Sequence, residues 1–288
     1  MKKSYFLLHT AVLFLGFSPV FGKVISLNEG LLTWYRVFFS TLILFVILKL
    51  FKVNTRISFK EKFDIAKIGI FVSLSWVFFY AGIKHSTISV GVVCYCVASF
   101  FTAILEPLIS KSPFRVSEFL LSGLTILGIA LIFHFEASYQ LGIILGVIAP
   151  IFYTLFSIYN KQLAGRYDTK LISYYQMLGG TISLGLLLPF YLYFFPTENI
   201  LPSLKDCLYL FLLSLFCTVL VYVFLTEAMK KISAFTANLS MNLEPIYAII
   251  IAFLFFDEGK QVNSSFYMGL FFVVLSVVLQ TILSVKNN

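Results

Sequence analysis

Ten apolar stretches, each close to the length that crosses a bilayer, take up most of this chain. A helix needs about 20 predominantly apolar residues to span a membrane. The stretches lie at residues 5–25, 31–51, 65–83, 86–110, 118–135, 141–160, 171–195, 208–229, 233–256 and 265–285. Because only short connections remain between them, the sequence predicts an all-α polytopic membrane protein with ten transmembrane helices and no soluble domain.

The composition agrees with this class. With 60% hydrophobic and 12% charged residues, a chain of 288 residues has too little polar surface for a water-soluble globule. The first stretch follows Lys2 and Lys3, as in a signal peptide, but nothing soluble comes after it, so we expect it to stay as a helix. The four cysteines lack metal-ligand spacing and are interpreted as small buried hydrophobes. We expect no metal, no cofactor and no nucleic-acid partner.

The basic residues predict an orientation. If the N-terminus is cytoplasmic, sixteen of the 21 Lys and Arg residues fall on the inside, four on the outside, and Arg36 lies within a span. Cytoplasmic loops carry an excess of Lys and Arg. A missed or extra helix would move every later loop to the other side and remove the asymmetry. The pattern therefore predicts ten spans with both termini cytoplasmic, in a plasma membrane such as the bacterial inner membrane.

The chain also repeats itself. Residues 33–41 resemble residues 173–181, and the alignment places Arg36 on Gln176 at an offset of 176 − 36 = 140. We expect two halves, residues 1–137 and 138–288, with five helices each. Because five is odd, the second half enters the membrane with the opposite orientation. Inverted repeats are a transporter architecture, in which the substrate site lies between the halves and access alternates as they rock.

Further residues make the pattern specific. They are Arg36 early in the second stretch, Ile232-Ser233-Ala234 at the entry to the ninth, Pro245 within it, and the exit Phe256-Asp257-Glu258 followed by Gly269. With them the chain resembles the EamA-type branch of the drug/metabolite transporter (DMT) superfamily over nearly its whole length. The resemblance implies ten helices in two inverted five-helix repeats and the transport of small metabolites such as amino acids.

The fourth stretch departs from the pattern of that family. Ser99 stands where a mid-helix proline is usual, and Lys111-Ser112-Pro113 stands where an acidic exit is usual. No role of the family's fourth helix is therefore carried over to this stretch.

Glu244 lies beside Pro245 inside the apolar ninth stretch. A charge near the bilayer centre costs roughly 2.5–3.5 kcal/mol, so such a residue usually faces a cavity or a partner. We expect Glu244 to bind substrate or to carry a coupled proton; the alternative is a packing residue that is protonated or hydrogen-bonded, beside an ordinary kink. Asn238 and Asn242 share a different face of the same stretch and are further substrate-binding candidates.

Arg36 shares one helical face with Thr33 and Ser40. A planar guanidinium this far into a span suits an anionic group or a carboxylate. The alternative, an arginine that extends to the outer headgroups, stays equally open. The repeat mate Gln176 and its neighbour Tyr175 are candidates for the same site.

Other polar and aromatic residues complete the predicted lining. Glu106 in the fourth stretch is a second candidate for proton coupling, or a solvated residue near the interface. The remaining substrate-binding candidates, a few polar groups among aromatic side chains, are His9, Trp76, Tyr95 and Ser99.

The sequence contains no HExxH, GxGxxG, Walker or GxSxG motif, so an enzyme is not expected, and no nucleotide-binding domain that would use ATP. The prediction is a secondary transporter, an exporter or exchanger, of small organic metabolites such as amino acids or related compounds. Transport would be coupled to protons or driven by the gradient of the substrate. The alternatives are a non-transporting membrane scaffold or a carrier of a lipid-like substrate, and the oligomeric state, a homodimer included, stays open.

Overall fold

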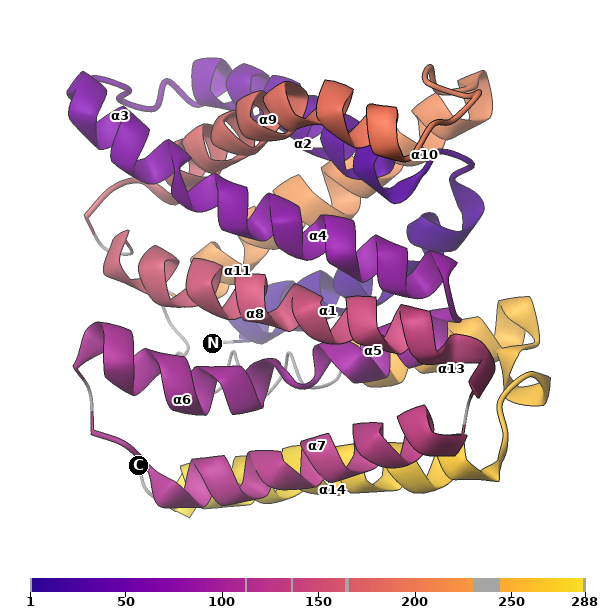
Figure 1. Ribbon diagram of the computed structural model, residues 1–288. Coiled ribbons are helices and arrows are strands. Elements are labelled where there is room, and N and C mark those ends of the chain that lie inside the picture. Colours follow the sequence, from indigo (N-terminus) through magenta and orange to yellow (C-terminus); the bar gives the residue numbers. More distant parts are fainter. Residues whose placement is uncertain (1, 112, 136, 164–165, 230–243, 287–288) are drawn as a thin grey trace.

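The computed structural model shows a bundle of long helices that run roughly side by side (Figure 1). It describes the chain apart from residues 1, 112, 136, 164–165, 230–243 and 287–288. No strand occurs among the described residues. The all-helical fold class predicted from the apolar stretches is therefore confirmed.

The elements in chain order are α1 (Lys2–Val24), α2 (Glu29–Leu50), α3 (Phe59–Ala66), α4 (Ile68–Lys84), α5 (Ile88–Tyr95), α6 (Ala98–Ser110), α7 (Val116–Phe135), the 3-10 turn η1 (Ala137–Tyr139), α8 (Gln140–Leu163), α9 (Thr169–Phe194), α10 (Leu204–Ser214), the π-helix η2 (Leu215–Leu220), α11 (Val221–Met229), α13 (Glu244–Phe256), the 3-10 turn η3 (Glu258–Lys260) and α14 (Ser264–Lys286).

In the described part of the chain, seven helical segments are long and apolar enough to cross a membrane. They are Ser4–Val24, Glu29–Leu50, Phe59–Lys84, Ile88–Ser110, Gln140–Leu163, Thr169–Phe194 and Leu204–Phe224. Three shorter apolar helices cover Phe119–His134, Glu244–Phe256 and Ser264–Ser276. The chain is thus a multi-pass membrane protein by length and composition.

Three stretches that the sequence predicts as continuous helices are interrupted. The stretch 65–83 begins inside α3 and breaks at Lys67 before α4. The stretch 86–110 divides into α5 and α6, with a turn at Cys96 and Val97. The stretch 208–229 begins earlier, at Leu204, because Ser203 and Asp206 form a capping box there, and it contains the π-helix η2. Neither apolar periodicity nor composition signals such local changes of helix type.

Capping boxes connect loops that are far apart in the sequence. Ser58 and Glu61 cap α3, and the Glu61 carboxylate also accepts a 2.8 Å hydrogen bond from the Tyr167 hydroxyl in the α8–α9 loop. In the same way Asp206, which caps α10 with Ser203, accepts 2.9 and 2.7 Å hydrogen bonds from the backbone N–H and hydroxyl of Ser26 in the α1–α2 loop. Each carboxylate therefore serves one helix N-terminus and one distant loop.

Two helix contacts join residues about 140 positions apart. The hydroxyls of Thr41 on α2 and Thr181 on α9 lie 3.1 Å apart and share a hydrogen bond. At the opposite edge of the bundle α7 packs along α14 (Figure 1), and Gly128 meets Gly269 so closely that a Cβ on either would lie 2.5 Å from the carbonyl oxygen of the other. The interior contacts thus recur at the spacing of the sequence repeat.

Glu258 ties the end of the ninth stretch to the start of the fourth. Its carboxylate is 1% exposed and accepts hydrogen bonds of 2.8 and 2.9 Å from the backbone N–H groups of Ile88 and Ser89, and one of 2.8 Å from the Ser89 hydroxyl. These donors are unsatisfied groups of the first turn of α5, where negative charge is favourable. The predicted boundary at Lys84-His85 agrees with this arrangement, since α4 ends at Lys84.

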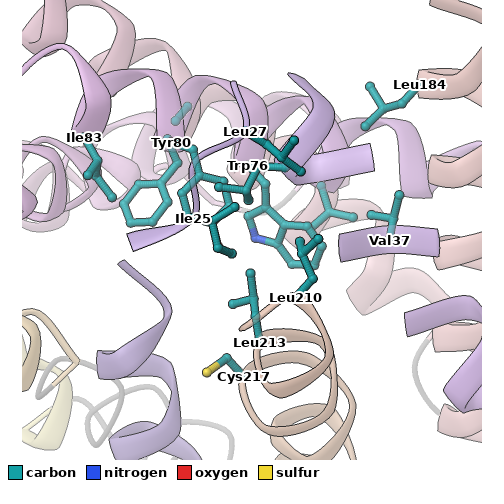
Figure 2. Packing of buried hydrophobic residues seen from close by; sticks show 14 of the residues in the cluster. Ile25, Leu27, Val37, Trp76, Tyr80, Ile83, Leu184, Leu210, Leu213 and Cys217 are labelled. Atoms are coloured by element: carbon teal, nitrogen blue, oxygen red, sulfur yellow. The ribbon is translucent and has the colours of Figure 1, made fainter. Parts of the chain in front are cut away.

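The largest apolar cluster lies where α2, α4, α9 and α10 meet the α1–α2 loop. Figure 2 shows part of it, with Trp76 of α4 close to Leu210 and Leu213 of α10. Cys217 of η2 is buried in the same cluster, and Cys94 is buried in a second one, as expected for small hydrophobes. The main core therefore joins helices from both halves of the sequence, and Arg36 lies inside it.

Candidate functional site

Arg36 is held in the interior by neutral protein groups. Its side chain is 1% exposed, so it does not extend to an interface. Nε donates a 3.1 Å hydrogen bond to the Thr218 hydroxyl, one terminal nitrogen donates a 2.7 Å bond to the Tyr80 hydroxyl, and the other donates a 3.3 Å bond to the Cys217 carbonyl. The acceptors come from α4 and η2, so the guanidinium joins three elements.

The guanidinium also stacks on an aromatic ring. The central carbon of Arg36 lies 3.6 Å from the centroid of the Trp76 ring, within the range of a strong cation–π contact. Trp76 therefore contacts the predicted residue Arg36 directly. Tyr80 is fully buried and also shares a 3.2 Å hydrogen bond with the Ser18 hydroxyl, which extends the arrangement to α1.

Two of the acceptors of Arg36 lie in the π-helix. Cys217 and Thr218 both belong to η2, and both accept from Arg36. In a π-helix the backbone bonds join residues five apart, and such turns appear frequently at functional sites. The Ser214 hydroxyl just before η2 donates a 3.0 Å bond back to the Arg36 carbonyl. Arg36 and this segment are therefore joined by three hydrogen bonds.

Glu244 begins the described part of its stretch and lies on the interior side of the same region. Its side chain is half-buried, and it lies within electrostatic range of the Arg36 guanidinium and of the neutral hydroxyls of Tyr95 and Tyr153. No ion pair within 4 Å links it to Arg36. The opposite charges therefore face the same region of the bundle without neutralising each other by direct contact.

Two tyrosines lie within electrostatic range of Glu244. The rings of Tyr95 and Tyr153 are 5.3 Å apart, and Tyr95 also packs 5.1 Å from Phe79. The Tyr95 hydroxyl shares a 3.1 Å hydrogen bond with Ser75. Tyr95 and Tyr153 are each half-buried although helices surround them. We call Arg36, Trp76, Tyr95, Tyr153 and Glu244 the central cluster.

Three other predicted residues contact partners that do not belong to the central cluster. Gln176 is buried and donates a 2.9 Å hydrogen bond to Asn160. Tyr175 lies on another side of α9, where its ring is 6.0 Å from the Lys62 ammonium. Ser99 follows the turn between α5 and α6 and donates a 3.2 Å bond to the Cys96 carbonyl.

Two predicted residues lie away from the central cluster. The Glu106 carboxylate accepts a 2.6 Å contact from the ammonium of Lys161, a side chain that is 75% exposed. This pairing matches the interface alternative for Glu106 better than an interior role. His9 lies on an exposed face of α1. Asn238 and Asn242 lie outside the described residues.

Sequence reasoning missed Tyr153, Cys217 and Thr218. Tyrosine is common in this chain, so Tyr153 on α8 carries no distinguishing signal. Cys217 and Thr218 contribute because η2 changes the helix type at their positions. Their partner Arg36 is about 180 residues away, which no local pattern reveals.

The family model of the EamA-like transporter family matches residues 2–134 and again residues 140–282. The chain belongs to the EamA-like transporter family. It is a membrane transporter, as that family is, with a lipid bilayer as its surroundings and a small molecule as its substrate.

Two curated relatives of this EamA-like transporter are named as transporters. The uncharacterized transporter YdfC of Bacillus subtilis is 27% identical over 240 residues, covering 80% of this chain and 76% of its own length. An uncharacterized transporter of Clostridium kluyveri is 21% identical over 307 residues, covering 100% of this chain and 96% of its own. Neither name states a substrate.

One crystal structure of a protein is similar over 97% of this chain and 98% of its own, with a TM-score of 0.63 and 12% sequence identity. At that identity the likeness shows the fold alone. The EamA-like fold of this transporter is thus one that an experimentally determined structure shares over almost the full length.

Replacing Arg36 with lysine in this EamA-like transporter tests the arrangement around it. Lysine keeps the charge but loses the planar group that bonds three acceptors and stacks on Trp76. Because each lost bond to a charged group is worth about 1.5–3 kcal/mol, we expect Arg36→Lys to lower the free energy of unfolding by about 2–4 kcal/mol. Thermal unfolding in detergent measures this, with the exposed Lys60→Arg, an exchange of the same two side-chain types, as the matched control. Equal melting temperatures of the two variants would contradict the structural role of Arg36.

Proposed function

We propose that this protein is a secondary transporter that carries small organic metabolites with an amino group, such as amino acids or related compounds. Substrate is bound at the central cluster, and access alternates between the two halves of the chain. The proposal rests on Glu244, a partly buried residue inside the bundle that lies within electrostatic range of Tyr95 and Tyr153.

The two charged residues of the central cluster differ in how many hydrogen bonds they make with the rest of the protein. Arg36 is almost fully buried, and each of its three guanidinium nitrogens donates one hydrogen bond, to Thr218, to Tyr80 and to a backbone carbonyl. Glu244 has no hydrogen bond with another described residue. A buried carboxylate is costly unless it is paired. Glu244 is therefore the group with binding capacity to spare.

A protonated amine satisfies Glu244 best. Ammonium groups form short, charge-assisted hydrogen bonds with carboxylates and are attracted to the faces of tyrosine rings. The aromatic rings of Tyr95 and Tyr153 also offer apolar area to the body of a metabolite, as binding pockets usually do.

Glu244 is also the better candidate for carrying a coupled proton. A single carboxylate can hold either a proton or the amino group of a substrate, so occupancy by one excludes the other and links the two flows. Glu106 is less suited because it is already paired with Lys161. An exporter or exchanger driven by protons needs no nucleotide-binding domain.

The proposal includes ten spans in two inverted halves, residues 1–137 and 138–288, with both termini cytoplasmic. Residues related by a twofold axis meet only near that axis, so the contact of Thr41 with Thr181, which the repeat aligns at an offset of 140, supports the inverted arrangement. The family model also matches the two halves separately. In a bacterium the surrounding bilayer is the inner membrane.

This topology predicts which positions face each side of the membrane. Residue 54, between α2 and α3, belongs on the cytoplasmic side, and residue 205, at the start of α10, on the outside. Impermeant thiol reagents applied to cells should label a cysteine at 205 and spare one at 54, each introduced into a protein without its four native cysteines. Labelling of both from the same side would contradict the ten-span arrangement.

The function is tested by counterflow in proteoliposomes that contain the purified protein. Solutes are tested in matched classes of amines, amino acids, carboxylic acids and neutral compounds. We expect saturable exchange of solutes that carry an amino group, and a loss of at least about tenfold in Glu244→Gln, because an amide gives up the charge-assisted bond. Glu106→Gln is the matched control and should exchange at the wild-type rate.

Other outcomes separate the parts of the proposal. Saturable flux that Glu244→Gln leaves unchanged would remove Glu244 from the binding site while the transport function stands. If no class of solute shows saturable flux, the protein acts as a scaffold or carries a lipid-like substrate instead.

A further inference from the structure

A basic pocket lies between the α2–α3 loop and the α8–α9 loop, away from the central cluster. Its volume is about 430 Å³, and three cationic side chains, Arg56, Arg166 and Lys170, line it. The hydrogen bond from Tyr167 to Glu61 ties the α8–α9 loop to α3, so the pocket is bordered by connected elements.

The side chains that line this pocket carry more positive than negative charge. Asp168 is the one carboxylate in the lining, and it is engaged as the N-cap of α9, where it accepts a 2.8 Å bond from the Lys170 backbone N–H. The Lys170 ammonium lies 3.9 Å from it. Among the described residues, neither Arg56 nor Arg166 has an ion pair. The N-terminus of α9 adds the positive end of its helix dipole.

The rest of the lining is apolar and continues into an apolar surface. Phe51 and Leu171 contribute to the pocket, and Phe51 is 67% exposed. From there Leu50, Val46 and Leu42 follow one another at intervals of four residues along α2, with exposed fractions of 72%, 52% and 47%. Residues spaced by four lie on one face of a helix. A ligand whose charged group occupies the pocket can therefore place an apolar chain along this face of α2.

We propose that the pocket lined by Arg56, Arg166 and Lys170 binds the headgroup of an anionic phospholipid, whose acyl chain lies along Leu50, Val46 and Leu42. The phosphate matches the planar donor groups of the two arginines, which bind it bidentately. Basic pockets between transmembrane helices recognise anionic headgroups in this way. Positive loops alone set orientation without gathering into a pocket, so the topological role of these residues does not account for their arrangement.

The test uses the full-length protein purified in a neutral detergent, with native mass spectrometry to count bound lipid. The probes are dioleoylphosphatidylglycerol, dioleoylphosphatidylcholine with the same chains and no net charge, and glycerol 3-phosphate as a headgroup without chains. The wild-type protein should bind the phosphatidylglycerol at least about tenfold more tightly than the phosphatidylcholine, and glycerol 3-phosphate should not displace it at equal concentration.

The double variant Arg56→Gln with Arg166→Gln should lose this preference by about tenfold or more, since each basic residue near a headgroup contributes a few-fold to affinity. The matched control, Lys60→Gln with Lys62→Gln, removes the same charge from neighbouring α3 outside the pocket lining and should keep the preference. Arg56→Gln alone, a change at an exposed side chain, should show an intermediate loss and serves if the double variant does not fold.

Three results would overturn the proposal. They are equal binding of the two lipids by the wild-type protein, an undiminished preference in the arginine variants, and an equal loss in the lysine control. Displacement of the lipid by glycerol 3-phosphate would overturn it as well, because it would identify a site for small anions instead of a phospholipid.

Discussion

The structure depends on how one buried guanidinium is satisfied. Arg36 places a positive charge in the core. Its guanidinium donates hydrogen bonds to a hydroxyl on α4 and to a hydroxyl and a carbonyl on η2, and it stacks on an indole ring. An unpaired charge in such a place would be prohibitive, so these partners must come together when the bundle folds. The arginine thereby fixes α2 against elements from both halves of the chain. Two of these acceptors lie in the π-helix η2.

The same interior leaves Glu244 as the charge that the protein itself does not fully pair. Arg36 acts on it electrostatically, and no ion pair joins these two residues. Transporters need such asymmetry, because a site that the protein satisfies completely has nothing to offer a substrate, and one left wholly unsatisfied would destabilise the fold. The central cluster lies between these two extremes, because the protein satisfies its cation and leaves its carboxylate, beside two tyrosine rings, available to a substrate.

Much of the fold could be predicted from the sequence, because a bilayer imposes length and apolarity on each span independently of its neighbours. The apolar stretches correspond to helices, and the stripe of Thr33, Arg36 and Ser40 is buried as its spacing suggested. The repeat offset of 140 reappears in the contact of Thr41 with Thr181. What could not be predicted depends on partners far away in the chain: the turn between α5 and α6, the π-helix, and the role of Glu258 as a cap on a helix 170 residues earlier. For the candidate site, the sequence identified the charged residues but not which of them the protein would satisfy internally.

In the proposed mechanism, substrate binds to Glu244 while Arg36 stays engaged by the protein. The decisive measurement is an experimental structure with a solute that the protein exchanges in proteoliposomes. We expect the amino group of the solute within hydrogen-bond distance of the Glu244 carboxylate, beside Tyr95 and Tyr153, with Arg36 still bonded to Thr218 or Tyr80. A solute bound elsewhere, or one whose anionic group has taken Arg36 from its protein partners while Glu244 is uninvolved, would contradict it.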